Sequence, residues 1–439
     1  MCLTRQLYQA VVVPRVTYAT SVWLRPLYTQ GSDKPQCGSL GVIKRLKRIQ
    51  CMAAITILGA MCTSPTDTLD LHTFLPPTSI LLQKILHQSM ACMAMLPKSH
   101  PLCPKIDWIE KHDMQHHKSA LHHLIHTLDL RPLEMETINP HPTKLNAIPP
   151  MTTHIASTKE EALEKHRNLT SKTKVYMDGS CTEGKVGAAA VLYTDDRQVS
   201  TLRYHLGSAE EHTVFKVEMV GLILAAHLLA TSHKITLPAT ILADNQVAIQ
   251  ASEHPTAKSG HYLCLCFRNT MHSVLTENKA TREDLMVQWI TGHRDVKGNE
   301  VADVEAKCTA LDKDTTSPLI DLPKCLHKKL PIGALAVKQK HKAELMVMWK
   351  CQWTKFKHFT HLARIDSSAP SKNFMCAIGY LPKSQAGTMY QLRSGHITLN
   401  QHLHRINRSN TPSCLQCEVD KPETVHHMLF KCAQYNSIR

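Results

Sequence analysis

The middle of the chain alternates apolar segments with short polar turns, and this alternation constrains its fold more than any other feature. Three segments rich in Val, Tyr and Leu, separated by Gly or by Asp-Asp, are predicted to form antiparallel strands at 174–177, 186–194 and 199–206. Further strands are predicted at 240–243 and 285–290, and helices at 213–230 and 261–275. We therefore expect an α/β domain with a mixed five-stranded sheet flanked by helices.

Four acids and one histidine occur at or inside these predicted elements, in the order Asp178, Glu218, Asp244, His293 and Asp303. Asp178 and Asp244 are predicted to end strands. Glu218 is the one acid inside an apolar helix, where an unpaired carboxylate would be costly. Asn299 is predicted to cap the closing helix that carries Asp303. Mg²⁺ prefers oxygen ligands, and two such ions can activate water and stabilise a leaving oxygen in phosphodiester hydrolysis.

Each of these residues also has an ordinary explanation when it is taken alone. The Asp-Gly-Ser sequence at 178–180 is commonly a turn, and the Asp-Asn sequence at 244–245 is a common helix start. His293 follows a glycine and is compatible with a plain loop residue. The coincidence of all five in this order favours a metal-dependent catalytic site.

This arrangement resembles the type 1 ribonuclease H domain over roughly residues 172–313. The resemblance implies a ribonuclease H-like fold and hydrolysis of the RNA strand of an RNA–DNA hybrid, leaving a 5′-phosphate. It also implies that two Mg²⁺ ions, which Mn²⁺ can replace, are bound by Asp178, Glu218, Asp244 and Asp303. His293 is then expected to assist turnover or product release.

One departure from that family concerns recognition of the RNA strand. Cellular ribonucleases H place an asparagine one helical turn before the glutamate, where it contacts RNA 2′-hydroxyls. This chain has Thr213-Val214-Phe215 at that place. Discrimination of the hybrid is therefore expected to be looser or to use other groups, because the 2′-hydroxyl is the mark that separates the two strands.

A second short motif resembles a catalytic signature but has a structural explanation. Residues 193–196, Tyr-Thr-Asp-Asp, match the Tyr-x-Asp-Asp signature of reverse transcriptases. They lie between two predicted strands, so a hairpin turn explains them. The other polymerase motifs are not found in the sequence, and we expect no polymerase activity.

The N-terminal region is predicted to be helical, with a basic amphipathic helix that starts at Ile43 and runs toward Leu58. Its cations at 44, 45, 47 and 48 either bind a nucleic-acid backbone or form the solvated face of a packed helix. Three motifs follow one another here: Tyr18-x-x-x-x-Trp23, Leu46-x-x-Ile49-Gln50 and Thr63-Ser64-Pro65-Thr66. Together they resemble the end of the reverse transcriptase region in LINE-type (non-LTR) retrotransposon polyproteins, from a fungal host, without the catalytic palm.

The C-terminal tail contains the pattern C-x2-C-x9-H-x4-C, formed by Cys414, Cys417, His427 and Cys432. Two thiolates from a tight turn, followed by an imidazole and a thiolate, make a closed tetrahedral site for structural Zn²⁺. His426 is the rival ligand, but His427 keeps the four-residue gap before Cys432. The block 391–435 resembles the zinc-knuckle segment that follows ribonuclease H in some fungal LINE-type elements. Chance clustering is the alternative, because the chain contains 16 Cys.

The net charge of +15 points to a polyanionic partner, and its distribution is uneven. Residues 151–322 contain 18 Lys and Arg against 22 Asp and Glu, whereas residues 323–439 contain 18 against 5. The flanks are therefore expected to supply charge for nucleic-acid phosphates. No secretory signal is evident, and the apolar stretch 51–62 is too short to cross a membrane. We expect an intracellular protein, nuclear or in a retroelement ribonucleoprotein, with no membrane partner.

The predicted organisation has five parts. They are a helical reverse transcriptase remnant at 1–129, a proline-rich linker at 130–171, a ribonuclease H domain at 172–313, a basic helical region at 323–410 and a zinc knuckle at 411–435. Two functions are compatible with it. The first is a Mg²⁺-dependent nuclease acting on RNA–DNA hybrids, with the polymerase part of the same element as a possible partner. The second is a catalytically idle nucleic-acid-binding remnant.

Overall fold

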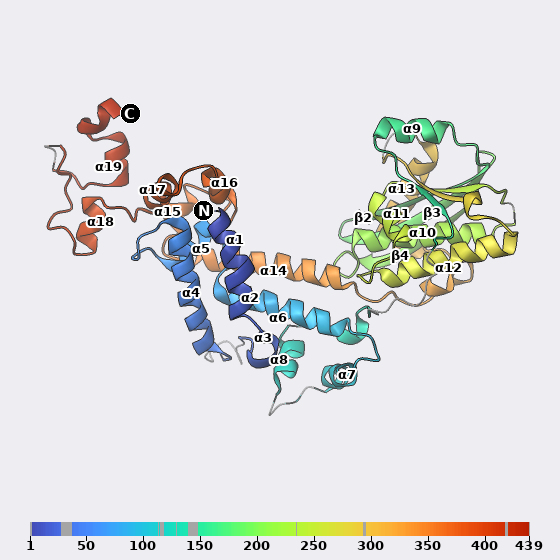
Figure 1. Cartoon of the computed structure of the whole chain (residues 1–439), viewed down its shortest axis with the longest axis horizontal. Coiled ribbons are helices and arrows are strands. Elements are labelled where there is room, and N and C mark those ends of the chain that lie inside the picture. The colour runs from blue at the N-terminus through green and yellow to red at the C-terminus, as the bar shows by residue number, and fades with distance from the viewer. Residues whose placement is uncertain are drawn as a thin grey trace. The chain divides into compact units, whose positions relative to one another are not determined.

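The computed structural model describes residues 2–27, 37–112, 114, 118–128, 130–138, 148–233, 235–292, 296–417 and 420–438. The chain forms two compact units, whose elements are labelled in Figure 1. The sheet unit comprises residues 90–115 and 129–340. The helical unit comprises residues 1–89, 116–128 and 341–439, so it is assembled from both ends of the chain.

The sheet unit is built around a six-stranded mixed sheet with the strand order β1-β6-β5-β2-β3-β4. The strands are β1 (Thr152–His154), β2 (Thr173–Thr182), β3 (Lys185–Thr194), β4 (Arg197–Ser208), β5 (Ala239–Ala243) and β6 (Leu285–Trp289). β2, β3 and β4 are antiparallel, whereas β5, β6 and β1 extend the sheet in parallel. All five predicted strands are present. The predicted count of five strands was wrong, because it missed β1. This edge strand has only three residues, all half-buried, so its sequence shows no alternation of apolar and polar residues that could predict it.

β2 is longer than its sequence predicted, and this changes the place of Asp178. It pairs with β3 over ten positions, from Thr173↔Thr194 to Thr182↔Lys185, so Asp178 lies inside a strand and not at its end. The pairing of β2 with β5, in contrast, runs only from Thr173 to Tyr176. Asp178 therefore follows directly after the point where the parallel pairing stops.

The Tyr-Thr-Asp-Asp segment is a hairpin turn, as predicted. β3 ends at Thr194 and β4 begins at Arg197, and the two residues between them, Asp195 and Asp196, have φ values of 49° and 60°. Two successive residues with positive φ are the signature of the tight turn that matches the twist of antiparallel strands.

Helices cover both faces of the sheet (Figure 1): α9 (Lys159–Arg167), α10 (Val214–Thr231), α11 (Gln246–Glu253), α12 (His261–Asn278) and α13 (Lys297–Leu311). α10, α11 and α12 share one core with Val175 and Met177 of β2, whereas α13 packs with Tyr176, the residue between them, on the opposite face. By length and composition, α10 is the one helix among the described residues that could cross a membrane. It is 72% buried, which fits the core helix of a folded domain.

The start of α13 differs from the prediction. Val296 occupies the N-cap position, and its carbonyl accepts hydrogen bonds from the N–H groups of Asn299 and Glu300 at 2.9 and 3.1 Å. Asn299 is therefore a buried residue of the first turn and not the cap. The backbone becomes helical earlier than the polar side chain indicated, which places Asp303 in the second turn.

The predicted linker at 130–171 is largely folded. It contains a short 3₁₀ turn at Pro132–Glu134, then β1, then α9. Prolines stop at Pro150, and the following segment has its own helix signal: the Thr158 side chain accepts from the N–H of Glu161 and caps α9. Residues 139–147, which hold two of the prolines, lie outside the described part.

The helical unit joins the two helical regions that the sequence predicted as separate parts. Its helices are α1 (Cys2–Leu7), α2 (Val13–Val16), α3 (Thr20–Trp23), α4 (Leu40–Leu58), α5 (Thr66–Thr73), α8 (Ala120–Thr127), α15 (Phe359–Ala363), α16 (Asn373–Ile378), α17 (Lys383–Ser394), α18 (Asn400–Arg405) and α19 (Val425–Phe430). Leu58 and Leu69 share a core with Phe374 and Tyr390, and the Thr68 hydroxyl lies 3.1 Å from the Tyr390 hydroxyl. Residues more than 300 positions apart thus depend on one another for burial.

Four further helical segments are a π-helix at Tyr8–Val12, α6 (Thr78–Ala94), α7 (Cys103–Lys111) and α14 (Ala334–Thr354), of which α7 lies in the sheet unit. The predicted boundary at 323 is displaced, because residues 323–340 belong to the sheet unit and Leu326 and Leu330 lie in its core. The basic helix predicted from Ile43 is α4, and all four of its cations are exposed.

Candidate functional site

Three of the four predicted metal-binding acids converge in the sheet unit. One carboxylate oxygen from each of Asp178, Glu218 and Asp244 lies within 4.8 Å of the other two. Two oxygens bound to one Mg²⁺ are separated by about 3 Å when adjacent and about 4.2 Å when opposite, given bonds of about 2.1 Å. The three acids are therefore close to the spacing that a shared ion requires.

The fold brings these acids together from three distant elements. Asp178 lies in β2, Glu218 in the second turn of α10 and Asp244 directly after β5. Two glycines permit the approach. A Cβ at Gly179 would lie 3.0 Å from the backbone nitrogen of Glu218, and a Cβ at Gly292 would lie 2.9 Å from Oδ2 of Asp244. The Asp-Gly sequence that looked like a turn therefore serves close packing of a strand against a helix.

Glu218 is under electrostatic stress in this cluster. Its side chain is 4% exposed, and its Oε2 atom has no hydrogen-bond partner among the described residues. Burial raises the pKa of Glu218 well above 4.5, and the nearby charges of Asp244 and Asp178 raise it further. A bound cation would remove this stress, because it supplies the missing partner and offsets the mutual repulsion.

Two groups that sequence reasoning did not single out support the cluster. The Asn245 side chain donates a hydrogen bond to Glu218, which opposes the rise in the Glu218 pKa, and its Oδ1 accepts from the Ala248 N–H at 3.1 Å to cap α11. The Trp289 indole N–H donates to the backbone oxygen of Asp244 at 2.9 Å. The only sequence signal for Asn245 was its position next to Asp244, which indicated a cap alone.

The remaining two predicted residues are placed differently. Asp303 is not among the three acids that converge within 4.8 Å; its Oδ2 accepts from Lys307, one helical turn later, at 2.7 Å. The hydrogen bond from Lys307 to Asp303 is the largest cause that raises the pKa of Lys307, and the charge of Asp178 raises that pKa further. Lys307 is thus within electrostatic reach of both acids. His293 lies outside the described residues.

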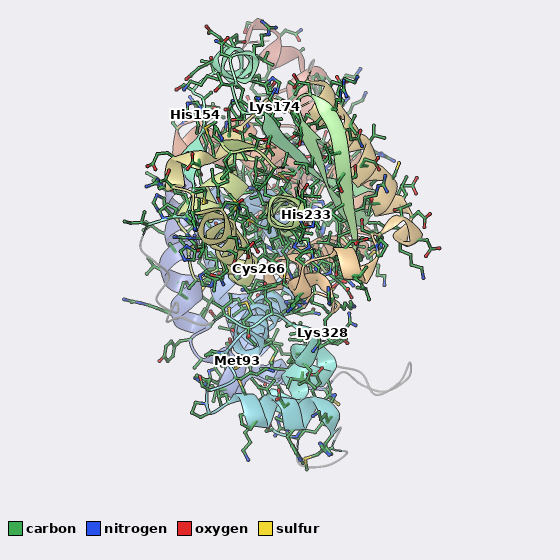
Figure 2. The ribbon with its side chains drawn as sticks, turned by 90° about the vertical axis from the view of Figure 1, so that its right-hand side faces the viewer. Met93, His154, Lys174, His233, Cys266 and Lys328 are labelled. Carbon is green, nitrogen blue, oxygen red and sulfur yellow. The ribbon has the colours of Figure 1, made fainter. Side chains whose placement is uncertain are left out.

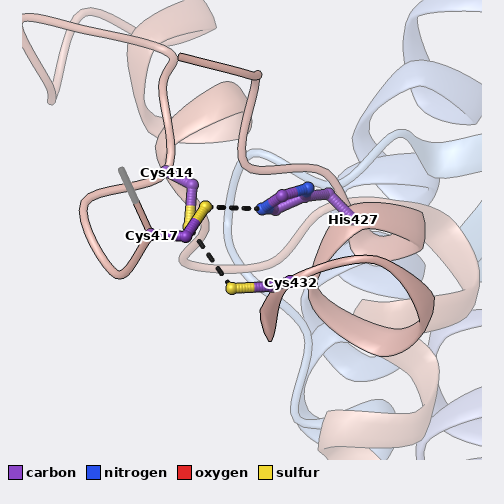
Figure 3. A group of neighbouring side chains, drawn as sticks. All are labelled: Cys414, Cys417, His427 and Cys432. Atoms are coloured by element: carbon purple, nitrogen blue, oxygen red, sulfur yellow. Dashed lines mark hydrogen bonds between the residues drawn. The ribbon is translucent and has the colours of Figure 1, made fainter. Parts of the chain in front are cut away.

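The C-terminal Cys and His residues form a second cluster, shown in Figure 3. Ligand atoms of Cys414, Cys417, His427 and Cys432 all lie within 4.8 Å of one another. Sγ of Cys414 and Sγ of Cys432 are 4.0 Å apart, and Sγ of Cys417 is 3.4 Å from Nε2 of His427. Tetrahedral Zn²⁺ with bonds of about 2.3 Å to sulfur and about 2.0 Å to nitrogen separates its ligands by about 3.5 to 3.8 Å. The donor set and its spacing fit that ion.

Local structure explains why His427, and not His426, joins this cluster. Ser413 and Pro422 form an antiparallel bridge, and the Cys414 N–H donates to the Lys421 carbonyl at 2.9 Å, which closes the loop that carries the first two cysteines. Thr424 caps α19 by accepting from the His427 N–H. His427 is then buried toward the cysteines, whereas His426 is exposed with its ring 5.4 Å from that of Phe430.

Comparison with known proteins bears on the sheet unit. Residues 170–310 match the family model RNase H. This segment is an RNase H domain. The match begins two residues before the predicted start of the domain and covers β2 through most of α13, including the three converging acids and Asp303. No curated protein matches the chain.

Two solved structures are similar to part of this chain. RNase H1 from the halophilic archaeon Halobacterium salinarum NRC-1 is 19% identical, with a TM-score of 0.24, and the match covers 32% of this chain and 98% of that protein. LC11-RNase H1 in complex with RNA/DNA hybrid is 16% identical, with a TM-score of 0.25, and the match covers 32% of this chain and 100% of that protein. The family match and the carboxylate geometry, and not these two structures, support the site.

The raised pKa of Glu218 predicts how pH affects stability of the RNase H domain without divalent ions. Because the folded-state pKa lies above 4.5, the stabilising contribution of the protonated form is complete below pH 4.5 and is lost as pH rises toward the folded-state pKa. In EDTA, the free energy of unfolding should therefore fall as pH rises above 4.5, by up to about 1.4 kcal/mol per pH unit relative to Glu218→Gln.

The protein is equilibrated in increasing urea at several pH values and then exposed to a brief deuterium pulse at one fixed pH. Deuterium uptake by peptides from β2 and α10 gives the unfolded fraction of the domain at each urea concentration. Glu300→Gln is the matched control, because Glu300 is exposed on α13. It should keep the wild-type pH dependence. Equal pH dependence in wild type and Glu218→Gln would show that Glu218 is not under the electrostatic stress described.

Proposed function

We propose that the RNase H domain is a Mg²⁺-dependent endonuclease that hydrolyses the RNA strand of RNA–DNA hybrids. The observation that carries the proposal is the convergence of three carboxylates, from β2, α10 and the end of β5, around a buried Glu218 oxygen that has no hydrogen-bond partner in the described part of the chain. Carboxylates gathered in this way repel one another, so a purely structural role does not explain their grouping. The RNase H family typically uses Mg²⁺, and we expect that Mn²⁺ can replace it here.

The chain's own residues would divide the work as follows. Asp178, Glu218 and Asp244 would hold the metal, and Asp303 would join this set once its hydrogen bond from Lys307 is released. Asn245 orients Glu218, and the close packing at Gly179 fixes the Glu218 backbone against β2. When bound, the metal ions supply activation of the attacking water and stabilisation of the leaving oxygen. His293 would assist product release.

Recognition of the hybrid must differ in detail from that of cellular ribonucleases H. Thr213 occupies the N-cap position of α10 where those enzymes have asparagine near the glutamate, and Val214, the next residue, is 50% exposed. Neither side chain offers an amide. We propose that sequence-independent contacts to phosphates carry most of the affinity, with the exposed cations of α4 among their sources.

We further propose a retroelement origin. The basic helix and the Thr63-Ser64-Pro65-Thr66 segment resemble the end of a LINE-type reverse transcriptase from a fungal host, and the Tyr-Thr-Asp-Asp segment is a plain hairpin turn. The nuclease would remove the RNA template after a polymerase part of the same element has copied it. This activity would take place in the nucleus or in a retroelement ribonucleoprotein.

For the C-terminal cluster we propose structural Zn²⁺. Four donors leave no open position for substrate, and three of them, Cys414, His427 and Cys432, are buried.

The zinc proposal predicts a difference between adjacent histidines. Purified full-length protein should contain one zinc per chain by inductively coupled plasma mass spectrometry. His427→Ala should lose most of it, because three donors bind far more weakly than four, whereas His426→Ala should keep it. Equal zinc content in both variants would contradict the assignment of His427.

Substitution of single metal ligands tests the nuclease. Asp178→Asn or Asp244→Asn should lower the rate of Mg²⁺-dependent cleavage of a labelled RNA–DNA hybrid by on the order of a thousandfold or more, since several kcal/mol of transition-state stabilisation depend on the bound metal. Hybrid binding, followed by fluorescence anisotropy, should survive because the carboxylates repel phosphates.

The matched control is Asp196→Asn. Asp196 is 84% exposed in the β3–β4 turn, and asparagine tolerates its positive φ. This variant should cleave at the wild-type rate. An unchanged rate in Asp178→Asn would refute the metal assignment. Hybrid binding without cleavage in the wild type would favour the alternative, an idle binding remnant, for which the pairing of Asp303 with Lys307 is the supporting observation.

A further inference from the structure

Two cysteines of the sheet unit lie in unusually close contact. Cys266, labelled in Figure 2, lies in α12, and Cys325 lies in a 3₁₀ turn at Lys324–Leu326. Their Sγ atoms are 2.7 Å apart, although the residues are 59 positions apart in the chain. A disulfide bond measures about 2.05 Å, and two unbonded thiols do not normally approach so closely. The backbone thus holds these sulfurs near bonding distance.

We propose that Cys266 and Cys325 form a redox-active pair that closes to a disulfide by exchange with a small-molecule disulfide such as glutathione disulfide. The thiolate of Cys325 attacks one sulfur of that disulfide and releases the first small thiolate. Cys266 then loses its proton and attacks Sγ of Cys325, which releases the second. Two protein thiols are oxidised, one small disulfide is reduced to two thiols, and the two protons end on the released thiols.

The surroundings assign different roles to the two sulfurs. The Cys266 S–H donates to Cys325, and this hydrogen bond lowers the pKa of Cys325 and raises that of Cys266. Exposed lysines at 324 and 328 lie near Cys325 in the chain and would favour the approach of an anionic disulfide reagent, whereas Lys329 pairs with Glu211 at 3.1 Å. Both cysteines are partly exposed, so a small reagent can reach them.

The segment that carries Cys325 is already fixed to the domain by other contacts. Leu322, Leu326 and Leu330 lie in the core that α10 and α12 share. Farther along, the buried Lys216 ammonium donates to the Pro331 carbonyl, and the Ala334 N–H donates to Glu136. Because the turn is held in place before any bond forms, closure of the disulfide needs little rearrangement. Oxidation would then fasten the C-terminal exit of the domain to α12.

Mass spectrometry of the full-length protein tests this proposal independently of nuclease activity. Reduced protein is equilibrated in glutathione buffers of increasing oxidised fraction, free thiols are trapped by alkylation, and digests are searched for linked peptides. A Cys266–Cys325 link should form at oxidised fractions where Cys181 and Cys308, exposed thiols of the same domain, remain reduced. Exchange protection of α12 amides should rise with it, on the order of a hundredfold in the most protected ones.

Two variants separate a reactive pair from a passive contact. In Cys266→Ser, Cys325 should stop at the mixed disulfide with glutathione, since the resolving thiol is gone. Cys264→Ser, which removes a buried thiol from the same helix, should leave the link unchanged. Absence of the linked peptide at every buffer ratio, or linkage no earlier than for Cys181 and Cys308, would overturn the proposal.

Discussion

Repulsion among three carboxylates that the fold forces together is the constraint on which the rest of the RNase H domain depends. Glu218 is buried, and Asp178 and Asp244 face it within 4.8 Å. Such an arrangement lowers stability unless a proton or a cation compensates for it. The domain supplies partial compensation from its own groups, through Asn245 beside Glu218 and Lys307 beside Asp303. A divalent ion is the group that would satisfy all of these acids at once.

The sheet enforces this arrangement through a mismatch between two strand pairings. β2 pairs with β3 through Thr182 but with β5 only through Tyr176. The end of β5 therefore releases Asp244 beside Asp178, while the long hairpin holds Asp178 rigidly. Gly179 then lets α10 approach closely enough for Glu218 to complete the group. Asp178 and Glu218 lie within regular elements and Asp244 directly follows one, which suits the proposed metal site because such a site needs defined spacing.

Sequence reasoning found those acids because each lies beside a strong local signal, namely an apolar strand or an apolar helix. It failed where local signals are weak or misleading. β1 is too short to show a period, Asn299 looked like a cap although Val296, three residues earlier, is the N-cap of α13, and α9 follows a proline-rich stretch. The pairing of Asp303 with Lys307 follows helical spacing and was readable in the sequence, but its effect on the site depends on tertiary placement. The union of both chain ends in one helical unit rests on contacts such as Thr68 with Tyr390, for which a single sequence holds no signal.

Direct observation of bound metal tests the central claim most simply. Mn²⁺ can be titrated into the full-length protein, with the C-terminal cysteines already loaded with zinc, and free Mn²⁺ followed by electron paramagnetic resonance. The account predicts that wild-type protein binds Mn²⁺ and that Asp244→Asn loses at least one of the bound ions, whereas Asp196→Asn binds as wild type does. Absence of Mn²⁺ binding to the wild type, or equal binding by wild type and Asp244→Asn, would contradict it.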